Sequence, residues 1–239
     1  GQAGVDAPRD TAVYLSSGRG DMGAMTEVMA AIFEQRRAPR PLSFINTVSN
    51  AACFYVAQTL GLEAASSFIS SRYFSLESAL QTALEDANSG RIESALLGVV
   101  DAVVEPAGVH CRRLSLPEGT TLGEASHWLQ LVNQPGDRKV LGTISCVQFF
   151  SSEAALRDWF AGQTTGAGVS LAMGRHAEEQ QSRWLELTGL PLWEAPDKGY
   201  FDCKSAMTVC DFLSRGEGRL IHLNCDPLGR YAVIDLQRQ

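Results

Sequence analysis

The chain has 239 residues, of which 45% are hydrophobic and 20% charged, and its formal net charge is −7. This length allows a substantial buried core, and the composition is that of an ordinary globular protein. The acidic balance and the lack of a lysine and arginine cluster argue against a nucleic-acid partner. Because no apolar run approaches the roughly 20 residues that a bilayer requires, no membrane span is expected.

The cysteines form no C-x-x-C pair, and several lie within apolar runs. They are Cys53, Cys111, Cys146, Cys203, Cys210 and Cys225. This pattern predicts reduced, buried thiols in a cytoplasmic protein rather than a zinc site. No metal and no cofactor is expected.

The first elements alternate between strand and helix. A strand is expected at 11–15 and a helix over 24–37, in which apolar residues from Met25 to Phe33 recur at helical spacing. The segment RAPRP ends this helix, and a second helix is expected over 48–61.

A strand, a helix and a strand follow between residues 66 and 101. After a short strand at 66–70, Ser75 is a suitable N-cap for a helix with an apolar stripe from Leu76 to Ala87. Residues 94–101 are apolar on both faces, as a central strand should be. The three elements predict a βαβ unit.

The rest of the chain gives a second set of strands and helices. Strands at 125–133 and 139–150 flank the turn-rich QPGDR, which predicts a hairpin. There follow a helix at 151–161, a strand at 167–173, helices at 177–189 and 202–213, and a terminal hairpin of 219–225 with 230–236. We therefore expect an α/β protein with mixed sheets and covering helices, forming one compact unit over 1–239 with similar halves near 1–107 and 108–239.

Five segments carry a family resemblance, and their order adds to its specificity. They are SSGRGDMGAMTEVM (16–29), PLSFINTVSNAACFYVAQTLGL (41–62), GRIESALLGVVD (90–101), LGEASHWLQL (122–131) and HLNCDPLGRYAVIDL (222–236). Together they resemble the β-ketoacyl synthases, which have the thiolase-like fold. The short chain length factors, including those of aryl-polyene pathways, are the most similar subgroup. The resemblance implies a thiolase-like fold that is truncated relative to full synthases.

The resemblance also implies that the reactive positions have been lost. The family uses a cysteine nucleophile at a helix N-terminus and two histidines. Counting back from Gly90, the nucleophile position falls on Tyr73, while the histidine positions fall on Met173 and Tyr200. A phenol with an ordinary pKa of about 10 is a poor nucleophile at neutral pH, and a thioether cannot donate a hydrogen bond. The chain alone is therefore not expected to condense acyl groups.

Four side chains are candidates for a tunnel or an interface. In the family, the helix that corresponds to residues 46–55 lies by the two-fold interface, so Asn50, Phe54 and Tyr55 would limit chain length sterically. Ordinary core packing is the alternative. Phe74 would, with Tyr73, either narrow a pocket or fill the space of a lost site.

Two residues keep a catalytic alternative open, and three arginines suggest a contact surface. Cys53 is either a buried apolar thiol or a hidden nucleophile. His176 either replaces the histidine lost at Met173 or opens a helix on the surface. The basic residues Arg36, Arg37 and Arg40 are a candidate surface for an acidic carrier protein.

The expected function is that of a chain length factor. Such a subunit forms a heterodimer with a cysteine-containing β-ketoacyl-ACP synthase and shapes its acyl tunnel, in polyketide or fatty-acid-like biosynthesis. Acyl carrier protein is a further candidate partner. The first alternative is a stand-alone thiolase-like acyltransferase or thioesterase that uses a displaced Cys or His. The second is a homodimeric scaffold that binds carrier protein.

Overall fold

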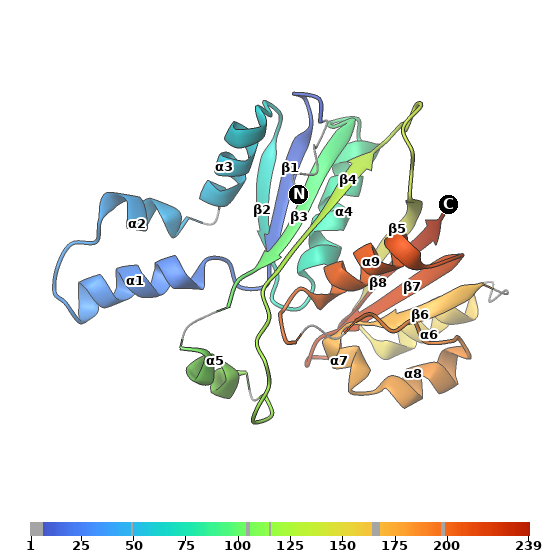
Figure 1. The fold of residues 1–239 in the computed structure, drawn as a ribbon. Helices are drawn as coiled ribbons and strands as arrows, with labels where there is room; N and C mark the ends of the chain where they lie inside the picture. The colour runs from blue at the N-terminus through green and yellow to red at the C-terminus, as the bar shows by residue number, and fades with distance from the viewer. Residues whose placement is uncertain (1–6, 49, 104–105, 115, 164–167, 197–198) are drawn as a thin grey trace.

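Two four-stranded mixed sheets form the centre of the molecule (Figure 1). The computed structural model describes residues 7–48, 50–103, 106–114, 116–163, 168–196 and 199–239. The first sheet has the order β2-β1-β3-β4 and comprises β1 (Ala12–Ser17), β2 (Ser66–Ser70), β3 (Ser94–Asp101) and β4 (Ala125–Val132). The second has the order β5-β8-β7-β6 and comprises β5 (Gly142–Phe150), β6 (Val169–Met173), β7 (Arg219–Cys225) and β8 (Tyr231–Arg238).

The predicted βαβ unit is confirmed. Strands β2 and β3 flank β1 and are both parallel to it, and helix α4 (Ser75–Asn88) joins them. In the second sheet β6 is parallel to β7, and β7 and β8 form the predicted terminal hairpin. In each sheet the parallel strands therefore end on the same side. In many α/β proteins ligands bind beside these C-terminal strand ends.

The predicted hairpin of residues 125–150 is wrong. Strand β4 pairs antiparallel with β3 in the first sheet, whereas β5 pairs antiparallel with β8 in the second. Residues 133–141 therefore carry the chain from one sheet to the other. The residues of QPGDR are compatible with a hairpin turn and with a connection between two sheets. Which strands pair depends on packing against the apolar faces of strands far away in the sequence.

Helices separate and cover the sheets (Figure 1). Helices α4 and α9 (Lys204–Arg215) lie between the two sheets, in a continuous core that includes Leu80, Leu97, Phe212 and Leu220. Helix α3 (Asn50–Leu60) packs on the other face of the first sheet, and α6 (Glu153–Ala161), α7 (Arg175–Glu178) and α8 (Gln181–Thr188) pack on the second. Helix α5 (Ala107–Arg113) follows β3.

An arm of residues 22–48 extends from this body (Figure 1). It contains α1 (Met22–Phe33) and α2 (Pro41–Asn46), which pack on each other. Helix α1 ends at Phe33, earlier than predicted. Helix α2 was not predicted, and it begins with a proline at its first position. Only part of the apolar stripe of α1 is covered, because Val28 is buried while Phe33 is 65% exposed. The arm therefore presents apolar side chains to solvent.

Candidate functional site

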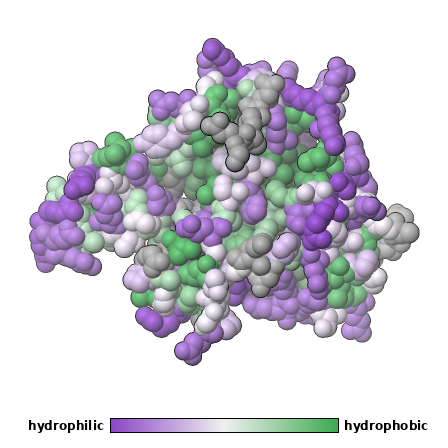
Figure 2. All heavy atoms as spheres, in the orientation of Figure 1, coloured by the Kyte–Doolittle hydropathy of each residue, from purple (hydrophilic) through white to green (hydrophobic). Residues whose placement is uncertain are grey.

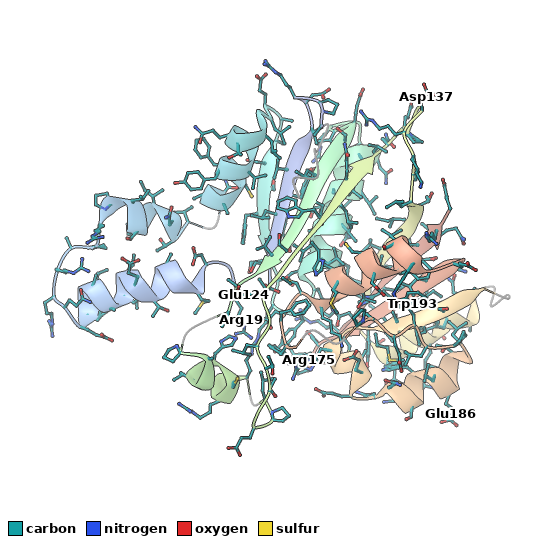
Figure 3. The ribbon with its side chains drawn as sticks, viewed as in Figure 1. Arg19, Glu124, Asp137, Arg175, Glu186 and Trp193 are labelled. Atoms are coloured by element: carbon teal, nitrogen blue, oxygen red, sulfur yellow. The ribbon has the colours of Figure 1, made fainter. Side chains whose placement is uncertain are left out.

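A pocket of about 620 Å³ lies at the entrance of α4, and we call it the elbow pocket. It is bounded by Arg72 and Tyr73 before α4, by α7, by the segment before α9 and by the turn between β7 and β8. Figure 3 labels Arg19, from the end of β1, and Arg175, from α7, which both line it.

The corner before α4 is held by hydrogen bonds rather than by the predicted N-cap. The N-cap is Phe74, and Ser75 lies in the first turn. The Ser75 hydroxyl donates to the Ser17 carbonyl at 3.0 Å and accepts from the Ser71 N–H at 3.2 Å. Ser75 therefore fixes the corner to the end of β1.

Tyr73, the residue predicted at the nucleophile position, lines the elbow pocket. Its ring meets that of His176 edge to face at 5.2 Å between centroids, and the Arg72 guanidinium lies 5.3 Å from its centroid. Its backbone carbonyl accepts a hydrogen bond from the Asn224 side-chain amide at 2.7 Å. His176 lies in the first turn of α7 and its ring faces Tyr73, and its role as a replacement histidine stays a prediction.

Tyr200 also lines the pocket, in a network of charges. Its hydroxyl donates to Asp202 at 2.7 Å, and Asp202 is paired with Arg19. The Arg175 guanidinium lies 4.0 Å from the centre of the Tyr200 ring. Burial, and then the Asp202 carboxylate, raise the pKa of Tyr200, so its phenol is a weaker acid than usual. Helix α9 begins at Lys204 with Cys203 as its N-cap, so Tyr200 precedes the helix entrance at which it was predicted.

Met173 does not reach the pocket. It ends β6 with only 3% of its surface exposed, in the apolar core of the second sheet. The backbone N–H of Gly174 then donates to the Leu223 carbonyl at 2.8 Å. A Cβ atom at Gly174 would lie 2.2 Å from the side-chain oxygen of Asn224, so this glycine allows β6 and β7 to meet beside the pocket.

The buried side chain of Asp101 links β1, β3 and α9. This buried carboxylate ends β3 and accepts hydrogen bonds from the Ser17 hydroxyl at 3.1 Å, the Gly18 N–H at 3.0 Å and the Cys203 N–H at 2.6 Å. One side chain therefore holds together the ends of β1 and β3 and the N-terminus of α9. The sequence comparison noted an acidic residue here but predicted no role for it.

Behind Tyr73 lies a buried polar cluster that the sequence analysis missed. Asn224 donates to Glu77 at 2.9 Å, and His222 Nδ1 is 3.8 Å from the same carboxyl oxygen. Burial raises the pKa of Glu77 to about 7 and lowers that of His222 to about 4. Near neutral pH the histidine is uncharged, so the contact is not an ion pair. Both ring nitrogens and the second carboxyl oxygen lack a hydrogen-bond partner among the described residues.

No cysteine has the features of an activated nucleophile in its described surroundings. Cys225 lines the elbow pocket, and burial raises its pKa to about 11. Burial also raises the pKa of Cys203 and of Cys53, which donates to the Ser67 carbonyl at 3.3 Å. All six cysteines are free thiols. In the described part of the chain, no three His, Cys, Asp or Glu side chains are grouped as a metal site would require.

The tunnel and interface candidates lie in two different places. Phe54 and Tyr55 are 57% and 44% exposed on α3 and pack edge to face on each other, and Asn50 is exposed at the start of the same helix. Phe74 is buried against Phe149, away from the elbow pocket. Their predicted roles in a tunnel remain predictions.

The architecture described above is the thiolase-like α/β fold of ketosynthases, in a short chain. The described helices include none that is both long and apolar enough to span a bilayer. No protein-family model matches the chain, and no curated protein matches it.

Solved structures do match it. The ishigamide ketosynthase/chain length factor is 17% identical with a TM-score of 0.77, and the alignment covers 98% of this chain and 75% of that one. A ketosynthase complex with the acyl-carrier protein of a type II polyketide synthase (AntDE:AntF) is 14% identical with a TM-score of 0.69, covering 98% and 77%. The ketosynthase ApeO in complex with its chain length factor ApeC, from Xenorhabdus doucetiae, is 14% identical with a TM-score of 0.55, covering 95% and 69%. At these identities the likeness concerns the fold.

Proposed function

We propose that this chain is a non-catalytic ketosynthase-like subunit, a chain length factor. It would pair with a cysteine-containing β-ketoacyl-ACP synthase and shape that subunit's acyl tunnel. The condensation on carrier-protein thioesters would take place in the partner, in a polyketide or fatty-acid-like pathway. The finer assignment to the aryl-polyene type rests on the sequence resemblance alone.

One observation carries the proposal: among the described residues, no activated thiol lies at the corner before α4. Tyr73 occupies the pocket at this corner, and the pocket's one described thiol, Cys225, has a pKa raised to about 11 by burial. A thiol acts as a nucleophile through its thiolate, so little of Cys225 is reactive at neutral pH. A subunit with this corner could pair with a synthase and shape its tunnel, although it would not perform the condensation itself.

Exposed apolar surface supports the pairing. The exposed apolar residues of the arm are Met25, Met29, Ile32, Phe33, Leu42, Phe44, Ile45 and Val48. Figure 2 shows hydrophobic residues among hydrophilic ones on the arm. Strand β2 lies at the edge of the first sheet beside α3, with one strand neighbour among the described strands. Exposed apolar side chains and an open sheet edge are both typical of protein-binding faces.

Substitution of the arm tests this pairing. The double variant Phe33→Asp, Phe44→Asp should lose a stable complex with a cysteine-containing β-ketoacyl synthase encoded beside this gene, because two buried charges would face apolar partner surface. The wild type should co-elute with the synthase at the mass of a one-to-one complex in size-exclusion chromatography with light scattering. We expect affinity to fall about a hundredfold or more.

Leu141→Asp is the matched control, since Leu141 is 50% exposed next to β5, away from the arm (Figure 1). It should leave the complex intact. Absence of a complex with the wild-type chain, together with unchanged product length when the chain is omitted, would contradict the proposal. A stable homodimer that binds carrier protein but no synthase would favour the scaffold instead.

The competing enzyme hypothesis has a separate test. A thiol-directed acyl mimic should leave Cys225 without stoichiometric label at pH 7 in the native chain, because burial keeps this pocket thiol protonated. Mass spectrometry of the intact protein reports the label. One equivalent of label on Cys225, lost in Cys225→Ala, would favour a displaced-cysteine acyltransferase or thioesterase.

A further inference from the structure

Two arginines of the elbow pocket, Arg72 and Arg175, have no carboxylate partner among the residues that the structure describes. Each lies over a tyrosine ring, Arg72 at 5.3 Å from the centre of Tyr73 and Arg175 at 4.0 Å from that of Tyr200. Stacking occupies the flat face of a guanidinium and leaves the N–H groups in its plane free to donate. Both arginines therefore retain donors for an oxyanion.

The described acidic side chains that line the pocket already have cationic or imidazole partners. Asp202 pairs with Arg19, Asp226 with Arg230, and Glu179 lies 3.4 Å from the imidazole of His176. The other described cation of the pocket, Lys204, is paired with Glu178 at 2.7 Å. The contact of Glu179 with His176 is an ion pair only when the histidine is protonated, so the two stacked arginines outnumber the one lining carboxylate that lacks a lysine or arginine partner.

The shape of the pocket suits a small ligand. Its volume of about 620 Å³ falls in the range of small-molecule sites, and two tyrosine rings provide flat apolar walls. Guanidinium groups bind phosphate and carboxylate oxygens in a bidentate manner. Two guanidinium groups from different segments match the three terminal oxygens of a phosphate monoester better than the two oxygens of a carboxylate.

We infer that the elbow pocket binds a small organic phosphate monoester. Arg72 and Arg175 hold the phosphate, and the organic part lies against Tyr73 and Tyr200. The inference goes beyond the proposed function, since it requires neither a partner subunit nor a reaction. A pocket that has lost its nucleophile is on this view a ligand-binding site.

Calorimetric titration of the isolated chain at constant ionic strength tests the inference. Wild-type protein should bind both inorganic phosphate and phenyl phosphate, the second more tightly because its ring contacts the tyrosines. Arg72→Gln and Arg175→Gln should each weaken phenyl phosphate binding about tenfold or more, and the double variant should show no measurable binding. Arg138→Gln is the matched control, because this exposed arginine lines a different pocket and lacks a carboxylate partner among the described residues.

Three results would overturn the inference. They are no binding of either phosphate to the wild type, equal binding by the double variant, and binding of benzoate as tight as that of phenyl phosphate. Circular dichroism and the melting temperature would verify that the variants are folded. Because the titration uses the chain without a synthase, its failure leaves the pairing proposal intact, and a failure of pairing leaves the titration interpretable.

Discussion

Asp101→Ala should lower the free energy of unfolding by about 3–5 kcal/mol, as measured by urea denaturation. The Asp101 carboxylate accepts hydrogen bonds from Ser17, Gly18 and Cys203, and two of these donors are backbone N–H groups that would remain buried without a partner. Alanine removes all three acceptor contacts and leaves a void between β1, β3 and α9.

Two controls separate the contribution of the Asp101 hydrogen bonds to stability from the effect of removing any surface charge. Asp101→Asn keeps one acceptor oxygen and should cost about half as much as alanine. Asp137→Ala removes a carboxylate from the exposed turn at the far edge of the molecule in Figure 3 and should change stability by less than about 0.5 kcal/mol. An Asp101→Ala variant as stable as Asp137→Ala would show that this carboxylate does not hold β1, β3 and α9 together.

Glu77→Gln should change how stability depends on pH. Burial raises the pKa of Glu77 from 4.5 to about 7, so between these values the folded protein binds more protons than the unfolded chain. The stabilising contribution of Glu77 is complete below its unfolded pKa and is lost as pH rises through its folded pKa. Relative to wild type, the glutamine variant should therefore gain about 1.4 kcal/mol in unfolding free energy per pH unit between about pH 4.5 and 7.

His222 has the opposite effect from Glu77 on how the free energy of unfolding depends on pH. Burial, together with the charge of Lys204, lowers the pKa of His222 from 6.5 to about 4, so its contribution is complete above pH 6.5 and is lost as pH falls through 4. In the wild type the two contributions should cancel between about pH 4.5 and 6.5, so that their sum changes little with pH there. In His222→Gln only the contribution of Glu77 remains, so the free energy of unfolding should fall as pH rises.

Urea unfolding midpoints across pH 4 to 8 provide the measurement for both variants. Glu85→Gln is the matched control, because Glu85 is exposed on the same helix, and it should follow the wild-type curve. Parallel curves for Glu77→Gln and wild type would mean that the pKa of Glu77 is the same in the folded protein as in the unfolded chain.

Elements defined by local patterns were predicted well from the sequence. The apolar stripe of α4 and the two-sided apolar character of β3 depend on neighbours only a few residues apart, and both elements lie where they were predicted. The prediction that β4 and β5 pair was wrong because a turn sequence indicates only that the chain bends. It does not indicate which sheet the next strand joins.

The site was predicted only in part, for a related reason. Counting along the chain located Tyr73 and Tyr200, which the fold does bring to one pocket, whereas Met173 is buried in a separate core. Arg175 and Asn224 come from distant segments, so their meeting at the corner before α4 has no local signal. The sequence analysis made no prediction for Glu77, which lies in the first turn of α4 and is buried because residues of α9 and β7 cover that face.

The course of residues 133–141 limits how this gene can be divided or recombined. A breakpoint at 107–108 would detach β4 from the sheet that it completes. A breakpoint within 133–141 would leave both sheets whole, but it would strip α4 and α9 of one of the two surfaces that enclose them. Neither fragment would then be a self-sufficient module, so duplication or fusion of this chain would have to carry both sheets together.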